Sequence, residues 1–208
     1  MKKLICIILL LNIYPILAQR SIQTINSAWE FTSEKDAETK IVNIPHTWNA
    51  EDAFRDGKEY FRGKGTYQKT FFVPQEWEQK RAFLKFEGSN QITTVFVNDK
   101  NIGEHRGGYT GFVFDISEAL KIGEENEIRI EVDNAHNTDI PPLDADFNFY
   151  GGIYRDLQLI LTDEIHFELF PSSPLNMLLE PHDCSVSLFP FPFSPPLFPL
   201  CLTAKNLK

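Results

Sequence analysis

The chain has 208 residues, 42% of them hydrophobic and 24% charged, which is the composition of a globular protein and excludes a largely disordered one. Its two ends differ from the rest, and residues 19–169, about 150 residues, make one domain's worth of chain. That length excludes a complete (β/α)₈ barrel beside a β-domain, because such a barrel alone takes roughly 250 residues. The formal charge of −9 argues against nucleic acid and against an anionic membrane as partners, since both attract basic patches.

Residues 1–18 have the features of a secretion signal. Lys2 and Lys3 form a positively charged start, residues 4–17 are mostly apolar, and Ala18 is a small residue at the expected cleavage point. The apolar stretch is too short and too interrupted for a membrane span. It predicts a secreted or periplasmic protein, with a buried N-terminal helix as the alternative. None of the three cysteines falls within residues 19–169, so the domain is expected to fold without disulfides.

The body of the chain has the pattern of β-structure throughout. Its strand candidates are rich in aromatic and β-branched residues, and most of them alternate apolar with polar positions. In chain order they are residues 66–73, 81–86, 92–97, 111–114, 127–132 and 153–161. Short strands separated by turns predict an all-β fold, a sandwich or jelly roll.

Two connections between these strands have recognisable signals. Residues 98–101, Asn-Asp-Lys-Asn, are typical of a hairpin turn. Ser117–Leu120 is the one segment that resembles a helical turn, and Ser117 is its expected N-cap.

Residues 170–208 break the β pattern. This tail holds eight of the 13 prolines, five phenylalanines and only four Asp, Glu, Lys or Arg residues, so it cannot form a strand ladder and is expected to lie outside the fold. Two origins are open: an apolar tail that docks on something, or the product of a frameshift or gene truncation. The composition favours the second.

Considered residue by residue, the body contains no recognisable catalytic motif. It has no glycine-rich phosphate loop, no nucleophile elbow and no metal-type spacing of its histidines, so no cofactor or metal site is predicted. The notable cluster is residues 139–156, where aspartates, an asparagine and several aromatic residues precede a strand. Aromatic faces with a few polar groups suit sugars. A packed loop with turn-forming aspartates is the structural alternative.

Several segments in this order resemble one known family. They are residues 43–49 (NIPHTWN), 65–71 (GTYQKTF), 86–91 (FEGSNQ), 97–98 (VN), 103–112 (GEHRGGYTGF) and 146–156 (DFNFYGGIYRD). Together they resemble the N-terminal sugar-binding domain of glycoside hydrolase family 2, the β-galactosidase and β-glucuronidase family. The combination of the 103–112 and 146–156 segments is the specific part of the resemblance, which extends over roughly residues 29–169.

The resemblance implies a galactose-binding-like jelly roll that is followed, in family members, by an immunoglobulin-like sandwich and a (β/α)₈ barrel. The two catalytic glutamates lie in the barrel. Because only residues 170–208 follow the body here, the chain is expected to be a non-catalytic fragment that ends before the barrel. Its expected partners are a β-galactoside or β-glucuronide and the missing catalytic domains. A free-standing carbohydrate-binding module and a docking subunit for a separate catalytic chain are the alternatives.

The resemblance also implies a role for three positions. Asp146 matches an aspartate that reaches the active site of the barrel, accepts hydrogen bonds from substrate hydroxyls and, in β-galactosidases, contacts a sodium ion. Arg62 lies near a position that supplies a polar residue in β-galactosidases, although the residue type differs. Asn148 is two residues after Asp146 and would face the same side of an extended segment. The structural alternatives are that Asp146 caps the loop and that Asn148 stabilises it.

Overall fold

The computed structural model describes residues 20–36, 38–54, 60–141, 148–164, 166 and 169. Within these residues the chain forms strands and single 3₁₀ turns, with no α-helix. The strands are β1 (Ser21–Thr24), β2 (Trp29–Ser33), β3 (Thr39–Val42), β4 (Lys64–Phe72), β5 (Lys80–Phe86), β6 (Ile92–Val97), β7 (Lys100–Arg106), β8 (Phe112–Asp115), β9 (Glu125–Asp133) and β10 (Leu157–Asp163). The 3₁₀ turns are η1 (Asp52–Phe54), η2 (Gln75–Trp77) and η3 (Ser117–Ala119).

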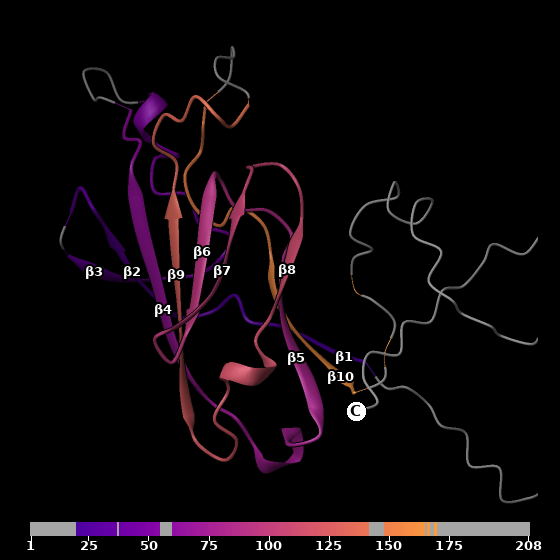
Figure 1. The fold of residues 1–208 in the computed structure, drawn as a ribbon. Helices are drawn as coiled ribbons and strands as arrows, with labels where there is room; N and C mark the ends of the chain where they lie inside the picture. Colours follow the sequence, from indigo (N-terminus) through magenta and orange to yellow (C-terminus); the bar gives the residue numbers. More distant parts are fainter. Residues whose placement is uncertain are drawn as a thin grey trace, which may run out of the picture.

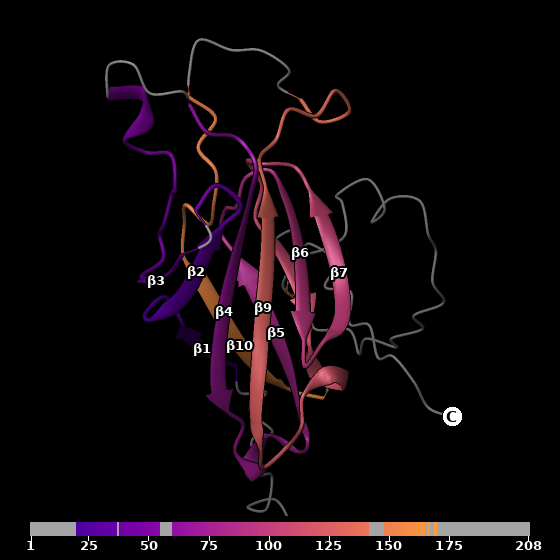
Figure 2. The same cartoon turned by 90° about the vertical axis from the view of Figure 1, so that its left-hand side faces the viewer.

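The strands form two antiparallel sheets that pack face to face as a sandwich (Figures 1 and 2). One sheet has the order β1-β10-β5-β8, and the other has the order β3-β2-β4-β9-β6-β7. The predicted all-β sandwich of jelly-roll type is therefore confirmed. No helix among the described residues is long and apolar enough to cross a membrane.

The core lies between the two sheets and follows from alternation along their central strands. In β9 the side chains of Ile128, Ile130 and Val132 are buried and belong to one core cluster, as their spacing predicts. Strand β5 is less regular because it is buried on both faces. Leu84 points into the core, whereas the neighbouring Phe83 is buried on the other face, where its ring meets that of His166 at 5.2 Å.

The six predicted strands correspond to β4, β5, β6, β8, β9 and β10. The last of them begins four residues later than predicted, because Ile153 pairs its carbonyl with the backbone of His46 instead of entering the sheet. The hairpin turn is confirmed: Asn98 and Asp99 have positive φ angles of 49° and 63° and join β6 to β7.

One prediction was wrong. Ser117 does not cap η3 from outside; it is the first residue of the turn. Its hydroxyl instead donates to Asp115 Oδ1 at 2.6 Å and accepts from the amide of Ala82 at 2.9 Å. Ser117 therefore fastens the end of β8 to β5 across the sheet.

Four connections meet at one end of the sandwich, the upper end in Figure 1. The pairing registers place the start of β4 opposite the end of β9 and the start of β6 opposite the end of β7, with the end of β5 beside the starts of β8 and β10. The β3–β4, β5–β6, β7–β8 and β9–β10 connections therefore gather there. We call this group the loop end, and two of the predicted site positions, Arg62 and Asn148, lie in it.

Candidate sugar-binding loop end

Two fully buried asparagines hold the loop end together. Asn49, in the β3–β4 connection, donates from Nδ2 to the carbonyl oxygens of Phe61 at 2.9 Å and Phe149 at 3.1 Å, and its Oδ1 accepts from the amide of Gly151 at 3.0 Å. One side chain thus joins the β3–β4 connection to the segment that leads into β10. The bond to Gly151 satisfies a buried backbone amide, which would be costly to leave unpaired.

Asn134, just after β9, makes the second half of this arrangement. Its Nδ2 donates to the same Phe149 carbonyl at 2.9 Å, and its Oδ1 accepts from the amide of Gly63 at 2.9 Å. The Phe149 carbonyl therefore accepts from two buried amides that come from different connections. We call Asn49 and Asn134 the asparagine clamp. Neither residue was predicted from the sequence, since a lone asparagine in a loop looks the same whether it is buried or exposed.

Arg62 packs against this clamp. Its Nε donates to the carbonyl oxygen of Asn134 at 2.7 Å, and its guanidinium lies over the Phe149 ring, 4.6 Å from the ring centre. Asn148 is exposed next to Phe149 in the chain. The fold thus brings Arg62 to the segment that carries Asn148. Asp146, the third predicted position, lies outside the described residues.

The two glycines before β10 are required by close contacts in the loop end. A Cβ atom at Gly151 would lie 2.3 Å from the Trp48 ring. Gly152 has a φ of +123°, and a Cβ there would lie 2.5 Å from the His46 carbonyl oxygen. These contacts explain the Gly-Gly pair of the 146–156 segment, because His46 and Trp48 lie directly against the backbone that precedes β10.

Four aromatic rings of the neighbouring core anchor this contact. Phe31 lies edge-on to His46 at 4.6 Å and stacks with Trp48 at 5.8 Å, and His46 Nδ1 is 2.9 Å from the hydroxyl of Tyr67. Burial lowers the pKa of His46 and raises that of Tyr67. Both groups are therefore neutral at pH 7, as a packed interior requires. His46 and Trp48 thus pack the β3–β4 connection against the sandwich.

A third asparagine fixes the side of the loop end nearest β6. Asn90 donates from Nδ2 to the Tyr150 carbonyl at 2.8 Å, and its backbone pairs with that of Gly152 in an isolated antiparallel bridge. The Tyr154 hydroxyl donates to the Gly108 carbonyl at 2.6 Å. Hydrogen bonds from three neighbouring connections, β3–β4, β5–β6 and β7–β8, therefore hold residues 148–154 in place.

Three tyrosines, Tyr60, Tyr109 and Tyr150, lie close together at the loop end. Burial and the neighbouring Tyr150 raise the pKa of Tyr60 to about 12, and burial also raises the pKa of Tyr109. These phenols stay protonated at neutral pH and offer O–H groups. The Tyr60 hydroxyl is buried and has no hydrogen-bond partner among the described residues, while Tyr109 and Tyr150 are 54% and 39% exposed. Together with Arg62 and Asn148 they form a surface with aromatic faces and hydroxyl, amide and guanidinium groups, which is the chemistry that a sugar requires.

Comparison with known proteins also indicates a sugar-binding domain, independently of the geometry of the loop end. A family profile described as "Glycosyl hydrolases family 2, sugar binding domain" matches residues 17–163. The chain is 48% identical over 149 residues to a β-glucuronidase of Bacteroides fragilis, and the match covers 71% of this chain and 21% of that protein. It is 34% identical over 149 residues to a β-galactosidase of Thermoanaerobacter pseudethanolicus, covering 70% of this chain and 20% of that protein.

Solved structures resemble this chain in fold as well as in sequence. The crystal structure of a β-glucuronidase from Bacteroides uniformis superimposes with a TM-score of 0.66 at 37% identity, covering 74% of this chain and 19% of that chain. This chain therefore spans about a fifth of the length of the relatives it matches.

Proposed function

Since this chain belongs to glycosyl hydrolase family 2 through the sugar-binding domain of that family, we propose that its loop end forms part of the sugar site of a complete β-glycosidase. The asparagine clamp is the observation that carries this proposal. Two buried amides fix the Phe149 carbonyl, and Arg62 covers the ring of the same residue. A segment held this firmly can present Asn148 to a substrate with little loss of entropy on binding.

The proposed roles follow from the chemistry of each group. Asp146 accepts hydrogen bonds from sugar hydroxyls, and its carboxylate is the group that would also contact a sodium ion in a β-galactosidase-like enzyme. Asn148 and Arg62 add an amide and a guanidinium at the rim of the site. The acid and nucleophile of the reaction come from other domains, because cleavage of a glycosidic bond needs two carboxyl groups that flank it.

The substrate class is a β-glucuronide or a β-galactoside. The relatives named for these two activities each match the chain over 149 residues, which supports the class without separating the two sugars. A free-standing carbohydrate-binding module and a docking subunit remain the alternative functions. They differ from the proposal in requiring no catalytic domain in the same protein.

A domain exchange tests the proposal. Residues 19–169 would replace the corresponding N-terminal domain of the Bacteroides fragilis β-glucuronidase, to which they are 48% identical over 149 residues. The hybrid should hydrolyse nitrophenyl β-glucuronide, while the same enzyme without any N-terminal domain should not. A hybrid that folds cooperatively but has no more activity than the shortened enzyme would overturn the proposal.

We also propose that the protein is exported, on the basis of residues 1–18. Expression of the full chain in a Gram-negative host should place the product outside the cytoplasm. Sequencing of its N-terminus should then begin at Gln19, and an intact Met1 on the exported product would contradict the assignment of a cleaved signal.

A further inference from the structure

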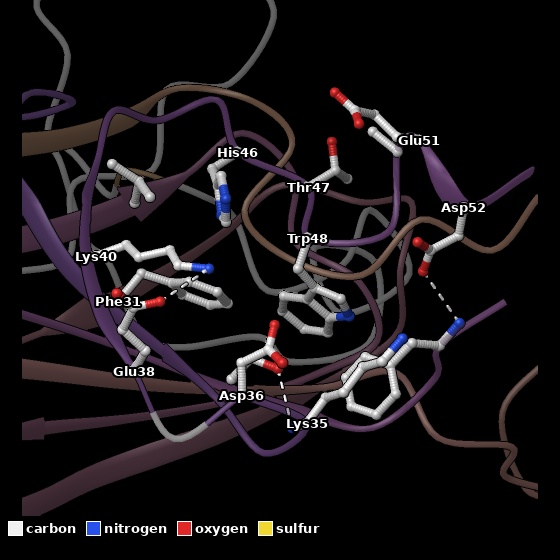
Figure 3. A pocket seen from close by; sticks show the side chains of 14 residues that line it. Phe31, Lys35, Asp36, Glu38, Lys40, His46, Thr47, Trp48, Glu51 and Asp52 are labelled. Carbon is white, nitrogen blue, oxygen red and sulfur yellow. Dashed lines mark hydrogen bonds and ion pairs between the residues drawn. The ribbon is translucent and has the colours of Figure 1, made fainter. Parts of the chain in front are cut away.

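A pocket opens beside the loop end, on the flank formed by the β2–β3 hairpin and the segment after β3. Its volume is about 420 Å³, which is enough for one monosaccharide unit. Figure 3 shows aromatic rings at its base and charged side chains around them.

Two rings form the base of the pocket. Phe31 and Trp48 lie nearly parallel, with 15° between their planes and 5.8 Å between their centres. Phe31 is 5% exposed and belongs to the core cluster, so the base is rigid. Flat apolar rings pack well against the C–H face of a pyranose, a surface that an ion or a flexible peptide does not offer.

Charged side chains surround these rings. The ammonium groups of Lys35 and Lys40 accompany the carboxylates of Asp36, Glu38, Glu51 and Asp52, so the lining is net negative. Contacts within the wall restrain some of these groups: Lys40 Nζ lies 3.6 Å from Glu38, and Asp52 accepts from the amide of Phe61 at 3.3 Å. The wall therefore presents both donors and acceptors while disfavouring an anionic ligand.

The Trp48 indole N–H is buried, so it does not line the pocket. Its Nε1 has no hydrogen-bond partner among the described residues, whereas Nε1 of Trp29 donates to the carbonyl oxygen of Ile25 at 2.7 Å. In Figure 3 the Trp48 nitrogen lies on the side of the indole nearer Asp52. Because a water molecule cannot reach this N–H, a ligand in the pocket would contact the partly exposed ring of Trp48 and not its N–H.

We propose that this pocket binds one uncharged pyranose unit of a glycan. The sugar ring lies against the partly exposed ring of Trp48, which the buried Phe31 supports, and its hydroxyls pair with the charged groups of the wall. A metal ion suits the pocket less well. Lysine ammonium groups stand among the carboxylates, and no three His, Cys, Asp or Glu side chains in the described part of the chain cluster as a metal site would require.

The indole N–H signals of the chain's three tryptophans provide a direct test with an internal control. The full-length chain, labelled with ¹⁵N, would be titrated with methyl β-galactopyranoside, methyl β-glucopyranoside and methyl β-glucuronide. The Trp48 indole signal should shift saturably with at least one neutral glycoside at millimolar concentrations, and less with the glucuronide at equal concentration. The Trp29 signal should stay fixed, because its N–H is already bonded within the protein.

A wall variant separates specific binding from a general effect of the sugar. Asp36→Ala should weaken the neutral glycoside about tenfold, the effect of one charge-assisted hydrogen bond. Glu118→Ala, which removes the same charge from the exposed turn η3 at the other end of the sandwich, should leave the titration unchanged. Three results would each overturn the proposal: no shift with either neutral glycoside, equal shifts at Trp29 and Trp48, or unaltered affinity in Asp36→Ala.

Discussion

Removing one side chain of the asparagine clamp should cost the domain a large part of its stability. In Asn49→Ala, the Phe61 carbonyl and the Gly151 amide both lose their bonds to this side chain, whereas the Phe149 carbonyl keeps the bond from Asn134. A buried backbone group left without a partner costs about 1–3 kcal/mol. The Gly151 amide is buried, whereas Phe61 is only half-buried, so the two groups together predict a loss of about 2–4 kcal/mol, against a total of about 5–15 kcal/mol for an ordinary domain.

Urea denaturation followed by tryptophan fluorescence measures this loss through the midpoint at constant slope. Asn101→Ala is the matched control, because Asn101 is exposed on the edge strand β7 and should change the stability by less than about 0.5 kcal/mol. Asn49→Asp keeps the size of the side chain but turns a carboxylate towards two carbonyl oxygens. Its destabilisation should shrink as the pH is lowered and the carboxyl is protonated. If Asn49→Ala unfolds at the same urea concentration as Asn101→Ala, the clamp is not what holds the loop end.

Three further predictions follow from the chain. Deleting residues 170–208 should improve solubility without lowering the thermal midpoint, since eight prolines cannot add a paired strand, and a large drop would show that the tail belongs to the fold. The unmodified chain should not hydrolyse nitrophenyl β-galactoside or β-glucuronide, and turnover that survives repurification would contradict this. Burial lowers the pKa of His46 and His105 below the value near 6.5 that both side chains have in the unfolded chain. At pH values below about 6.5, unfolding is therefore accompanied by the uptake of protons. Stability should therefore be full above that pH and fall as the pH drops through the folded values, and His46→Gln should reduce the urea-midpoint difference between pH 7.5 and 5.5.

The sequence predicted the fold class and six of the ten strands, because these six are rich in aromatic and β-branched residues and most of them alternate. The apolar residues Ile128, Ile130 and Val132 are an example: their alternation predicts that one face of β9 is buried in the core, and all three belong to the core cluster. The sequence missed four strands: β1, β2, β3 and β7. Of these, β1, β3 and β7 lie at sheet edges, where side chains are largely exposed and little hydrophobic pattern remains. The fourth, β2, is an inner strand with Trp29 and Phe31 buried, and its five residues make a pattern too short to stand out. Edge strands are held by backbone pairing, which leaves a weak trace in side-chain type.

The candidate site was likewise predicted only in part from the sequence. The Gly151–Gly152 pair and the His46–Trp48 segment were noticed as motifs, and the structure explains both by their contact with each other. Asn134 appears in no motif, because its role depends on facing Gly63 and Phe149 across two connections. Contacts of that kind arise from tertiary structure, and no local pattern encodes them.

The role of Asp146 can be separated from a purely structural one in the hybrid enzyme. Asp146→Asn keeps the shape of the side chain but removes the charge, so a substrate-binding carboxylate should lose charge-assisted hydrogen bonds to sugar hydroxyls. In a water-excluded site such a loss costs on the order of 2–4 kcal/mol of transition-state stabilisation, or roughly 30- to 1,000-fold in kcat/KM. A loop-capping aspartate predicts the reverse pattern: a lower thermal midpoint and nearly normal kinetics at low temperature.

The asparagine clamp supplies the reference for that comparison. Asn134→Ala removes the second donor from the Phe149 carbonyl and so loosens the same segment without altering the charge of Asp146. It should lower the midpoint and, through it, the activity at high temperature. If Asp146→Asn behaves like Asn134→Ala in both measurements, Asp146 acts on the loop. If Asp146→Asn lowers kcat/KM while the midpoint stays at the wild-type value, Asp146 contacts the substrate. A kcat/KM near the wild-type value would show that Asp146 is not part of the sugar site.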